Sequence, residues 1–276
     1  MKIIMTGEQG LIGSYLKKRL EKEGHQILYT PDIRGERKNI LNIDQIKVEE
    51  KIDMLIHLAA HCKINESIIN PELAHTNNVE GTFKVIEFCR KNNIPKIVFF
   101  SSSRILSKEK NPYTASKIYG EELCKAYKSC YGINYVIIRP STVYGPFWDK
   151  TERLMHKFII NALTGKDLIV YGNPETKTLD FTYINDFVDG VMLALQTENE
   201  EYDISGGEEY NIHKLAKFII EKTQSKSKII IQNEEIAQPQ EVKLDITKIK
   251  KLGYNPKMGI EQGVIETINW YKNNLQ

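Results

Sequence analysis

The sequence has little of what marks secreted, membrane-bound or nucleic-acid-binding proteins. Four cysteines in 276 residues, without C-x-x-C spacing, argue against a disulfide framework and favour reduced thiols in a cytoplasmic protein. The longest apolar run at the amino end, residues 3–5, is far too short for a signal peptide or a membrane span. Lys and Arg number 38 against 36 Asp and Glu, a formal charge of +2. This balance lacks the basic excess of a nucleic-acid or membrane-surface binder, so we expect neither partner.

The first 140 residues alternate short β-rich runs with helical patterns. Apolar or β-branched runs of strand length occupy 2–6, 26–30, 54–58, 96–100 and 135–138. Between them, Val79, Phe83 and Ile86 recur at helical spacing, and so do positions 119, 123, 126 and 130. Apolar strands separated by helices are typical of a parallel sheet buried on both faces. We therefore predict an α/β fold with a doubly wound parallel sheet of the Rossmann type.

The pattern loosens after residue 140. Helices are predicted over 151–163, 187–195, 211–222 and 261–271, with turn-rich segments between them. The chain is near the upper size of a single core, which favours a large domain with a smaller lobe. We expect a dinucleotide-binding domain over 1–140 and a substrate-binding lobe over 141–276. The two are expected to interleave, because strands of the first sheet should recur in the second half.

A glycine-rich loop, G-x-x-G-x-x-G, follows the first predicted strand and opens a helix. In such a loop Gly7 allows the tight turn, Gly10 lets the backbone approach a pyrophosphate, and Gly13 lets helix and strand pack closely. The free N–H groups at the start of the helix bind anionic phosphates. The loop therefore predicts a dinucleotide cofactor.

The choice between NAD and NADP depends on the loop after the second predicted strand. Asp32 lies where an acid binds the adenosine ribose hydroxyls and would repel a 2′-phosphate, which favours NAD. Arg34, Arg37 and Lys38 follow closely, and an arginine in this turn is how NADP is accommodated. We predict NAD, with NADP as the alternative.

A phenol and an ammonium four residues apart, Tyr113 and Lys117, share one face of a predicted helix. Free tyrosine ionises near pH 10, so we expect the lysine to lower the pKa of Tyr113 and make it a usable acid or base. The run Ser101–Ser103 ends the preceding strand and supplies a hydroxyl to polarise the same substrate oxygen. The other Y-x-x-x-K match, from Tyr210, lacks such a strand and is interpreted as a helix surface.

With these motifs the chain resembles the extended short-chain dehydrogenase/reductases, specifically the NAD-dependent epimerase/dehydratase group that acts on nucleotide sugars. The resemblance extends over nearly the whole chain, through the segments 56–60, 78–82, 139–146, 180–186 and 252–256. It implies that Tyr113 is the acid/base, Lys117 the ribose anchor and Ser103 the hydroxyl partner. It also implies that Pro140 meets the nicotinamide and that residues 58–60 contact the adenine side. The predicted cofactor-binding set is Gly7, Gln9, Gly10, Leu11, Ile12, Gly13, Asp32, Leu58, Ala59, Ala60, Ser101, Tyr113, Lys117 and Pro140.

Departures from the family pattern bear on substrate and reaction. Where family dehydratases carry Asp-Glu, this chain has Arg104 and Ile105, so dehydration is disfavoured. The usual Asn of the 139–146 segment is Thr142. The usual arginine before residue 180 is Leu179, and Lys177 is the nearby substitute for gripping a diphosphate. The candidate substrate residues are His61, Ser102, Arg104, Thr142 and Lys177.

The predicted function is an NAD(P)-dependent sugar-nucleotide epimerase that moves a hydride between nicotinamide and a sugar carbinol or ketone. An NAD(P)H-dependent 4-keto-sugar-nucleotide reductase would use the same residues, and so remains open. A non-catalytic dinucleotide-binding sensor is the alternative of another class, and retention of Tyr113 and Lys117 argues against it. No His, Cys and carboxylate spacing indicates a metal. The resemblance implies a homodimer formed through the helices at 73–91 and 113–131.

Overall fold

The computed structural model describes residues 1–32, 39–236 and 243–275. Its strands are β1 (Lys2–Thr6), β2 (Gln26–Tyr29), β3 (Met54–His57), β4 (Lys96–Phe100), β5 (Asn134–Pro140), β6 (Thr142–Tyr144), β7 (Leu168–Tyr171), β8 (Thr178–Tyr183), β9 (Glu200–Ile204), β10 (Glu209–Asn211) and β11 (Ile229–Gln232). Its α-helices are α1 (Leu11–Lys22), α2 (Ile64–Ile69), α3 (Pro71–Ala74), α4 (Gly81–Lys91), α5 (Pro112–Tyr131), α6 (Leu154–Leu163), α7 (Ile184–Ala194), α8 (Ile212–Thr223), α9 (Thr247–Lys250) and α10 (Ile260–Asn274). Short 3-10 turns η1 (Ile40–Gln45) and η3 (Ser103–Leu106) and a π-helical turn η2 (His75–Glu80) complete the described elements.

The large sheet is parallel throughout, in the order β2-β1-β3-β4-β5-β9. The chain leaves β1 toward β2 on one side and returns to β3 on the other, so the order reverses at β1. In open α/β sheets, ligands bind outside the carboxyl ends of the strands at this reversal. The predicted doubly wound fold is confirmed.

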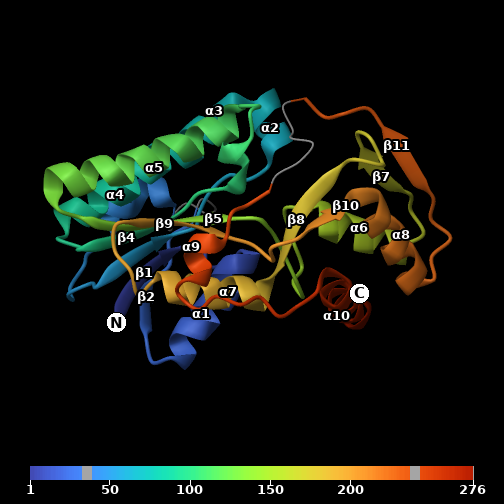
Figure 1. The fold of residues 1–276 in the computed structure, drawn as a ribbon. Coiled ribbons are helices and arrows are strands. Elements are labelled where there is room, and N and C mark those ends of the chain that lie inside the picture. Colours follow the sequence, from blue (N-terminus) through green and yellow to red (C-terminus); the bar gives the residue numbers. More distant parts are fainter. Residues whose placement is uncertain (33–38, 237–242, 276) are drawn as a thin grey trace.

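Helices cover both faces of this sheet. α4 and α5 lie on one face, and α1 and α7 lie on the other (Figure 1). The first strand shows why: Ile3 and Met5 belong to the core cluster that includes Leu16 of α1, whereas Ile4 belongs to the cluster that includes Val85 of α4. Alternate side chains of a strand point to opposite faces, so an unbroken apolar run fits a sheet buried on both sides.

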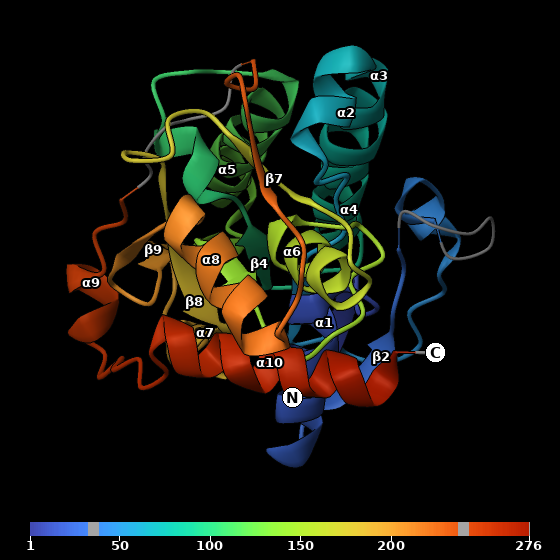
Figure 2. The ribbon, with the colours of Figure 1, turned by 90° about the vertical axis from the view of Figure 1, so that its right-hand side faces the viewer.

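The second half of the chain contributes to both parts of the molecule. β9 pairs with β5 and α7 packs beside α1, so both extend the first layer, as the expected interleaving requires. The other elements form a lobe with a three-stranded sheet, β10-β8-β6, and a two-stranded ribbon, β11-β7 (Figure 1). α10 runs across α6 and α8 at the edge of this lobe (Figure 2). The predicted boundary at residue 140 coincides with the end of β5 and stays a prediction as a domain boundary.

Two predicted helices in this half begin elsewhere in the structure. The helix expected from residue 151 begins at Leu154, because the Asp149 carboxylate accepts hydrogen bonds from the backbone and hydroxyl of Thr151 and holds a turn there. The helix expected from residue 187 begins at Ile184.

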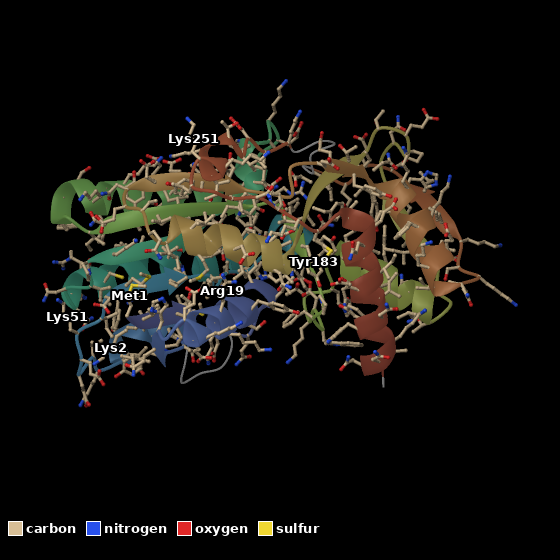
Figure 3. The ribbon with its side chains drawn as sticks, turned by 60° about the horizontal axis from the view of Figure 1, so that its bottom comes forward. Met1, Lys2, Arg19, Lys51, Tyr183 and Lys251 are labelled. Atoms are coloured by element: carbon tan, nitrogen blue, oxygen red, sulfur yellow. The ribbon has the colours of Figure 1, made fainter. Side chains whose placement is uncertain are left out.

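The carboxyl-terminal segment is tied to β8 and α7 by polar contacts. The Tyr183 hydroxyl donates to Glu266 of α10 at 2.7 Å, and Figure 3 shows Tyr183 beside that helix. The Asp186 carboxylate accepts the N–H groups of Lys257 and Met258 at 3.0 and 2.8 Å. Within the described ranges, none of the helices combines the length and apolar character needed to cross a bilayer.

Candidate active site

The three glycines of the loop differ in how much space the structure leaves for a side chain. Gly7 has φ +73°, and a Cβ there would lie 2.7 Å from the Ala59 nitrogen. A Cβ on Gly13 would lie 2.2 Å from the Gly7 oxygen. A Cβ on Gly10 would come no closer than 3.6 Å to another atom. Packing within the protein therefore accounts for Gly7 and Gly13 but not for Gly10.

Gly10 lies where a dinucleotide pyrophosphate would approach the chain. It is the N-cap of α1 and supplies no side-chain cap, and the first turn of this helix holds no acidic residue. The N–H groups at Leu11 and Ile12 are therefore positioned to bind an anion at the positive end of the helix. Gln9, exposed, precedes them. These residues fit NAD, with the loop holding its pyrophosphate.

The other predicted cofactor residues converge on the same edge. Asp32, 6% exposed, follows Pro31, whose carbonyl accepts the Gly7 N–H at 3.1 Å. Ala59 donates its N–H to the Thr6 hydroxyl at 3.0 Å, which places the start of the 58–60 segment against the glycine loop. The carboxyl ends of β1, β2 and β3 thus lie together at the point where the strand order reverses. Arg34, Arg37 and Lys38 lie outside the described residues.

Tyr113 lies at the start of α5, held by a strong helix-start signal. Asn111 and Thr114 form a reciprocal capping box, and Pro112 occupies the first turn. Tyr113 is 8% exposed, and the Ser102 side chain is close enough to it to favour the phenolate and so oppose the rise in its pKa. Ser102 of the serine run therefore lies near the tyrosine, and its role in the site stays a prediction. Ser103, predicted for this role, is buried beside it, and its role stays a prediction.

Lys117 lies one helical turn further along α5 and is 5% exposed. Its ammonium donates to the carbonyl of Phe100, the last residue of β4, at 2.8 Å. It lies 6.0 Å from the centre of the Tyr113 ring. Burial lowers the pKa of Lys117 to about 8. Lys117 is thus anchored at the end of β4, where its ammonium can donate a hydrogen bond to a ribose hydroxyl.

The prediction that Lys117 lowers the pKa of Tyr113 below that of free tyrosine is wrong. Burial, with a smaller contribution from the nearby Cys62, raises the pKa of Tyr113 to about 12. The Ser102 side chain and the guanidinium groups of Arg104 and Arg153 act in the opposite direction and lower the pKa of Tyr113. Desolvation outweighs these charges, because a phenolate loses its water at this depth.

Sequence reasoning missed two residues beside Tyr113. Arg153 caps the start of α6, forms an ion pair with Asp149 (Nε to Oδ2, 2.7 Å), and lines a cavity with Leu11 and Thr142. Cys62 is half-buried in the loop after β3. It is close enough to contribute to raising the pKa values of Tyr113 and Arg153. Neither has a local motif, so only the fold could reveal them.

The remaining predicted substrate residues come from separate segments, and of these only Thr142 lines the cavity that contains Arg153. His61 is held by Asn78, whose side chain accepts the His61 N–H at 2.7 Å and donates to its carbonyl at 3.0 Å. Thr142 begins β6, just after Pro140 ends β5. Lys177, 8% exposed, lies before β8 and is electrostatically coupled to Arg104.

Two other sequence interpretations have outcomes in the structure. Ser101 is 3% exposed and its N–H donates to the Ile138 carbonyl at 2.8 Å, at the end of β4. The second Y-x-x-x-K match is not a helix surface, because Tyr210 lies in β10 and Lys214 in α8. The Tyr210 hydroxyl donates to Glu261 of α10 at 3.0 Å.

A parallel sheet with a glycine loop at its reversal point, and a tyrosine and lysine at the end of β4, two strands away, define a dinucleotide-dependent enzyme of the Rossmann class. Residues 3–212 match the NAD dependent epimerase/dehydratase family, and the chain belongs to that family. The predicted family and the predicted cofactor, NAD, are thereby confirmed.

Individual relatives resemble the chain along its full length. A putative UDP-glucose 4-epimerase of Methanocaldococcus jannaschii is 31% identical, with 99% of each chain covered. The structure of UDP-glucuronic acid 4-epimerase from Bacillus cereus, solved with NAD and a fluorinated UDP-glucuronic acid, is 26% identical, covers 99% of this chain and 100% of its own, and has a TM-score of 0.91. The UDP-glucose 4-epimerase of Thermus thermophilus, in complex with NAD, shares the fold at 22% identity, with both chains fully covered and a TM-score of 0.89.

Proposed function

We propose that this protein is an NAD-dependent 4-epimerase of nucleotide sugars. The observation that carries the proposal is that a buried tyrosine and a buried lysine, which is bonded to the last carbonyl of β4, lie at the same sheet as a glycine loop that follows β1, two strands away. The similarity to proteins named as 4-epimerases supports it.

In this proposal Tyr113 takes the proton of the sugar hydroxyl and later returns it. Ser102 or Ser103 hydrogen-bonds to the same sugar oxygen, and Lys117 holds the cofactor ribose. Arg104 and Arg153 stabilise the phenolate form of Tyr113 when it has given up its proton. NAD supplies the hydride acceptor and, in its reduced form, the hydride donor.

The proposal is tested with purified protein, UDP-sugars and no added reductant. We expect the protein to interconvert a UDP-hexose or UDP-hexuronate with its 4-epimer, as measured by chromatography of the nucleotide sugars. Conversion of a 4-keto sugar only when NADH or NADPH is consumed would favour the reductase. NAD binding without conversion of either substrate type would favour the non-catalytic sensor.

We also propose that the protein is a cytoplasmic homodimer. Phe83 of α4 and Ile118 and Tyr131 of α5 are 43%, 36% and 55% exposed, which leaves apolar surface on the two helices expected at the interface. All four cysteines are free thiols, which suits a reducing compartment. Light scattering of the wild type and of Phe83→Glu tests the dimer.

A further inference from the structure

The two-stranded ribbon of the second lobe ends in an unpaired strand edge. β11 pairs in parallel with β7, and no other strand of the described ranges extends this sheet. The Lys228 carbonyl accepts the Leu168 N–H at 2.9 Å and so faces β7, and every second residue of a strand does the same. The N–H and C=O groups of Ile229 and Ile231 therefore face the opposite edge, which lies at the outer end of the lobe (Figure 1).

The sequence of β11 does not protect this edge. Edge strands of natural proteins usually carry a proline, a charge or a bulge that prevents pairing, whereas β11 is three isoleucines and a glutamine in regular register. Ile231 pairs with Val170, so their side chains point to the same face of the ribbon, the one that α6 and α8 cover. Val170 is fully buried, but Ile231 is 45% exposed. The covering helices thus leave the edge strand partly bare, and one more strand would cover it.

Charges of opposite sign flank the same edge. Lys228 directly precedes β11 and Glu234 closely follows it, and both side chains are exposed. Neither side chain forms an ion pair or a hydrogen bond with another described residue. Ile231 lies midway between them, three residues after Lys228 and three before Glu234. A twofold axis through Ile231 that generates an antiparallel neighbour would therefore place Lys228 of each strand opposite Glu234 of the other.

We propose that β11 pairs antiparallel with β11 of a second copy of this chain, which joins the two ribbons into one four-stranded sheet. The pairing satisfies the free backbone groups, covers Ile231 of both copies and forms two pairs between Lys228 and Glu234. β11 and α4 lie at opposite ends of the molecule (Figure 1), so this contact is separate from the helix interface proposed above. The two contacts together would join homodimers into larger assemblies. The inference does not depend on the proposed enzymatic activity.

The test is sedimentation equilibrium of protein carrying Phe83→Glu, which blocks the helix interface. We expect the mass to rise with concentration from that of one chain toward that of two. Adding Lys228→Glu should raise the dissociation constant by about tenfold or more, because two attractive cross-strand pairs become repulsive, and Glu234→Lys should do the same. Combining both reversals should restore the dissociation constant to within about threefold. The matched control is Lys166→Glu, the same reversal at an exposed lysine before β7, which should change it by less than about threefold.

Three results would overturn the inference. A Phe83→Glu protein that stays monomeric up to about 0.1 mM would show that the strand edge does not pair with itself. A dimer that neither Lys228→Glu nor Glu234→Lys weakens would place the contact on another surface. Loss of association in both single reversals without recovery in the combined variant would show that the two side chains do not face each other. If Phe83→Glu does not fold, the same reversals in the wild type should reduce assemblies larger than a dimer to dimers, and unchanged assemblies would refute the pairing.

Discussion

Alanine substitutions at Gly10 and Gly13 should separate cofactor binding from folding. A methyl group on Gly13 would overlap the Gly7 carbonyl at 2.2 Å and approach Glu8 Cα at 2.8 Å, both backbone atoms that cannot move aside easily. We expect Gly13→Ala to lower the free energy of unfolding by about 1–3 kcal/mol or more, the range for overpacking. NAD affinity should fall with it, because the loop must distort.

Gly10→Ala should act in the opposite way. Its added carbon has 3.6 Å of clearance and its φ of −79° suits any residue, so the expected loss is about 0.5–1 kcal/mol, that of an N-cap change to alanine. The methyl group would stand on the side from which the pyrophosphate approaches. We expect NAD affinity to fall by at least about tenfold, which corresponds to roughly 1.4 kcal/mol.

The matched control is Gly259→Ala. Gly259 is also an N-cap glycine, with φ −64° and no atom within 4 Å of an added Cβ, but it opens α10. It should show the same small stability change and unaltered NAD binding. Urea unfolding and NAD titration by fluorescence measure both quantities. Wild-type NAD affinity in a folded Gly10→Ala protein would refute the placement of the cofactor at this loop.

Two further predictions concern the core beneath the site. Burial lowers the pKa of His57 to about 3, so between that pH and its unfolded pKa of about 6.5 the unfolded state binds more protons, and stability is lost as the pH is lowered. His57 should therefore contribute about 2 kcal/mol to the stability lost between pH 7.5 and 5, and urea unfolding of His57→Asn should lack that share; an equal loss in both proteins would contradict it. Gly120→Ala would bring a Cβ within 2.2 Å of the Phe99 ring and should destabilise by about 1–3 kcal/mol. Adding Phe99→Leu should relieve part of this, and strict additivity in the double-mutant cycle would show that the two do not collide.

The parts of the fold with strong local patterns could be predicted from sequence. β1 and β4 are continuous apolar runs, and their burial on both faces follows from that composition. β9 has the sequence EEYDI, with only two of its five residues buried, so its apolar content is too low to predict a strand. Its place in the sheet follows from pairing with β5, a tertiary contact.

The residues of the candidate site can also be divided into those that a local sequence motif predicts and those that it does not. Gly7, Tyr113 and Lys117 belong to motifs whose spacing indicates a function, and the fold brings them to the carboxyl ends of β1 and β4, two strands apart in one sheet. Arg153 comes from a separate segment, and nothing near it in sequence marks it. The pKa of Tyr113 depends on how deeply α5 buries the phenol, and sequence spacing contains no information on depth.

The most direct test of the catalytic account is the turnover of Tyr113→Phe on a UDP-sugar that the wild type epimerises. The substitution removes one hydroxyl oxygen and leaves the ring that packs at the start of α5. We predict that NAD binding stays within about threefold while turnover falls by about a hundredfold or more, the scale for losing an acid/base group. Turnover equal to that of the wild type would show that the sugar proton is handled by another residue.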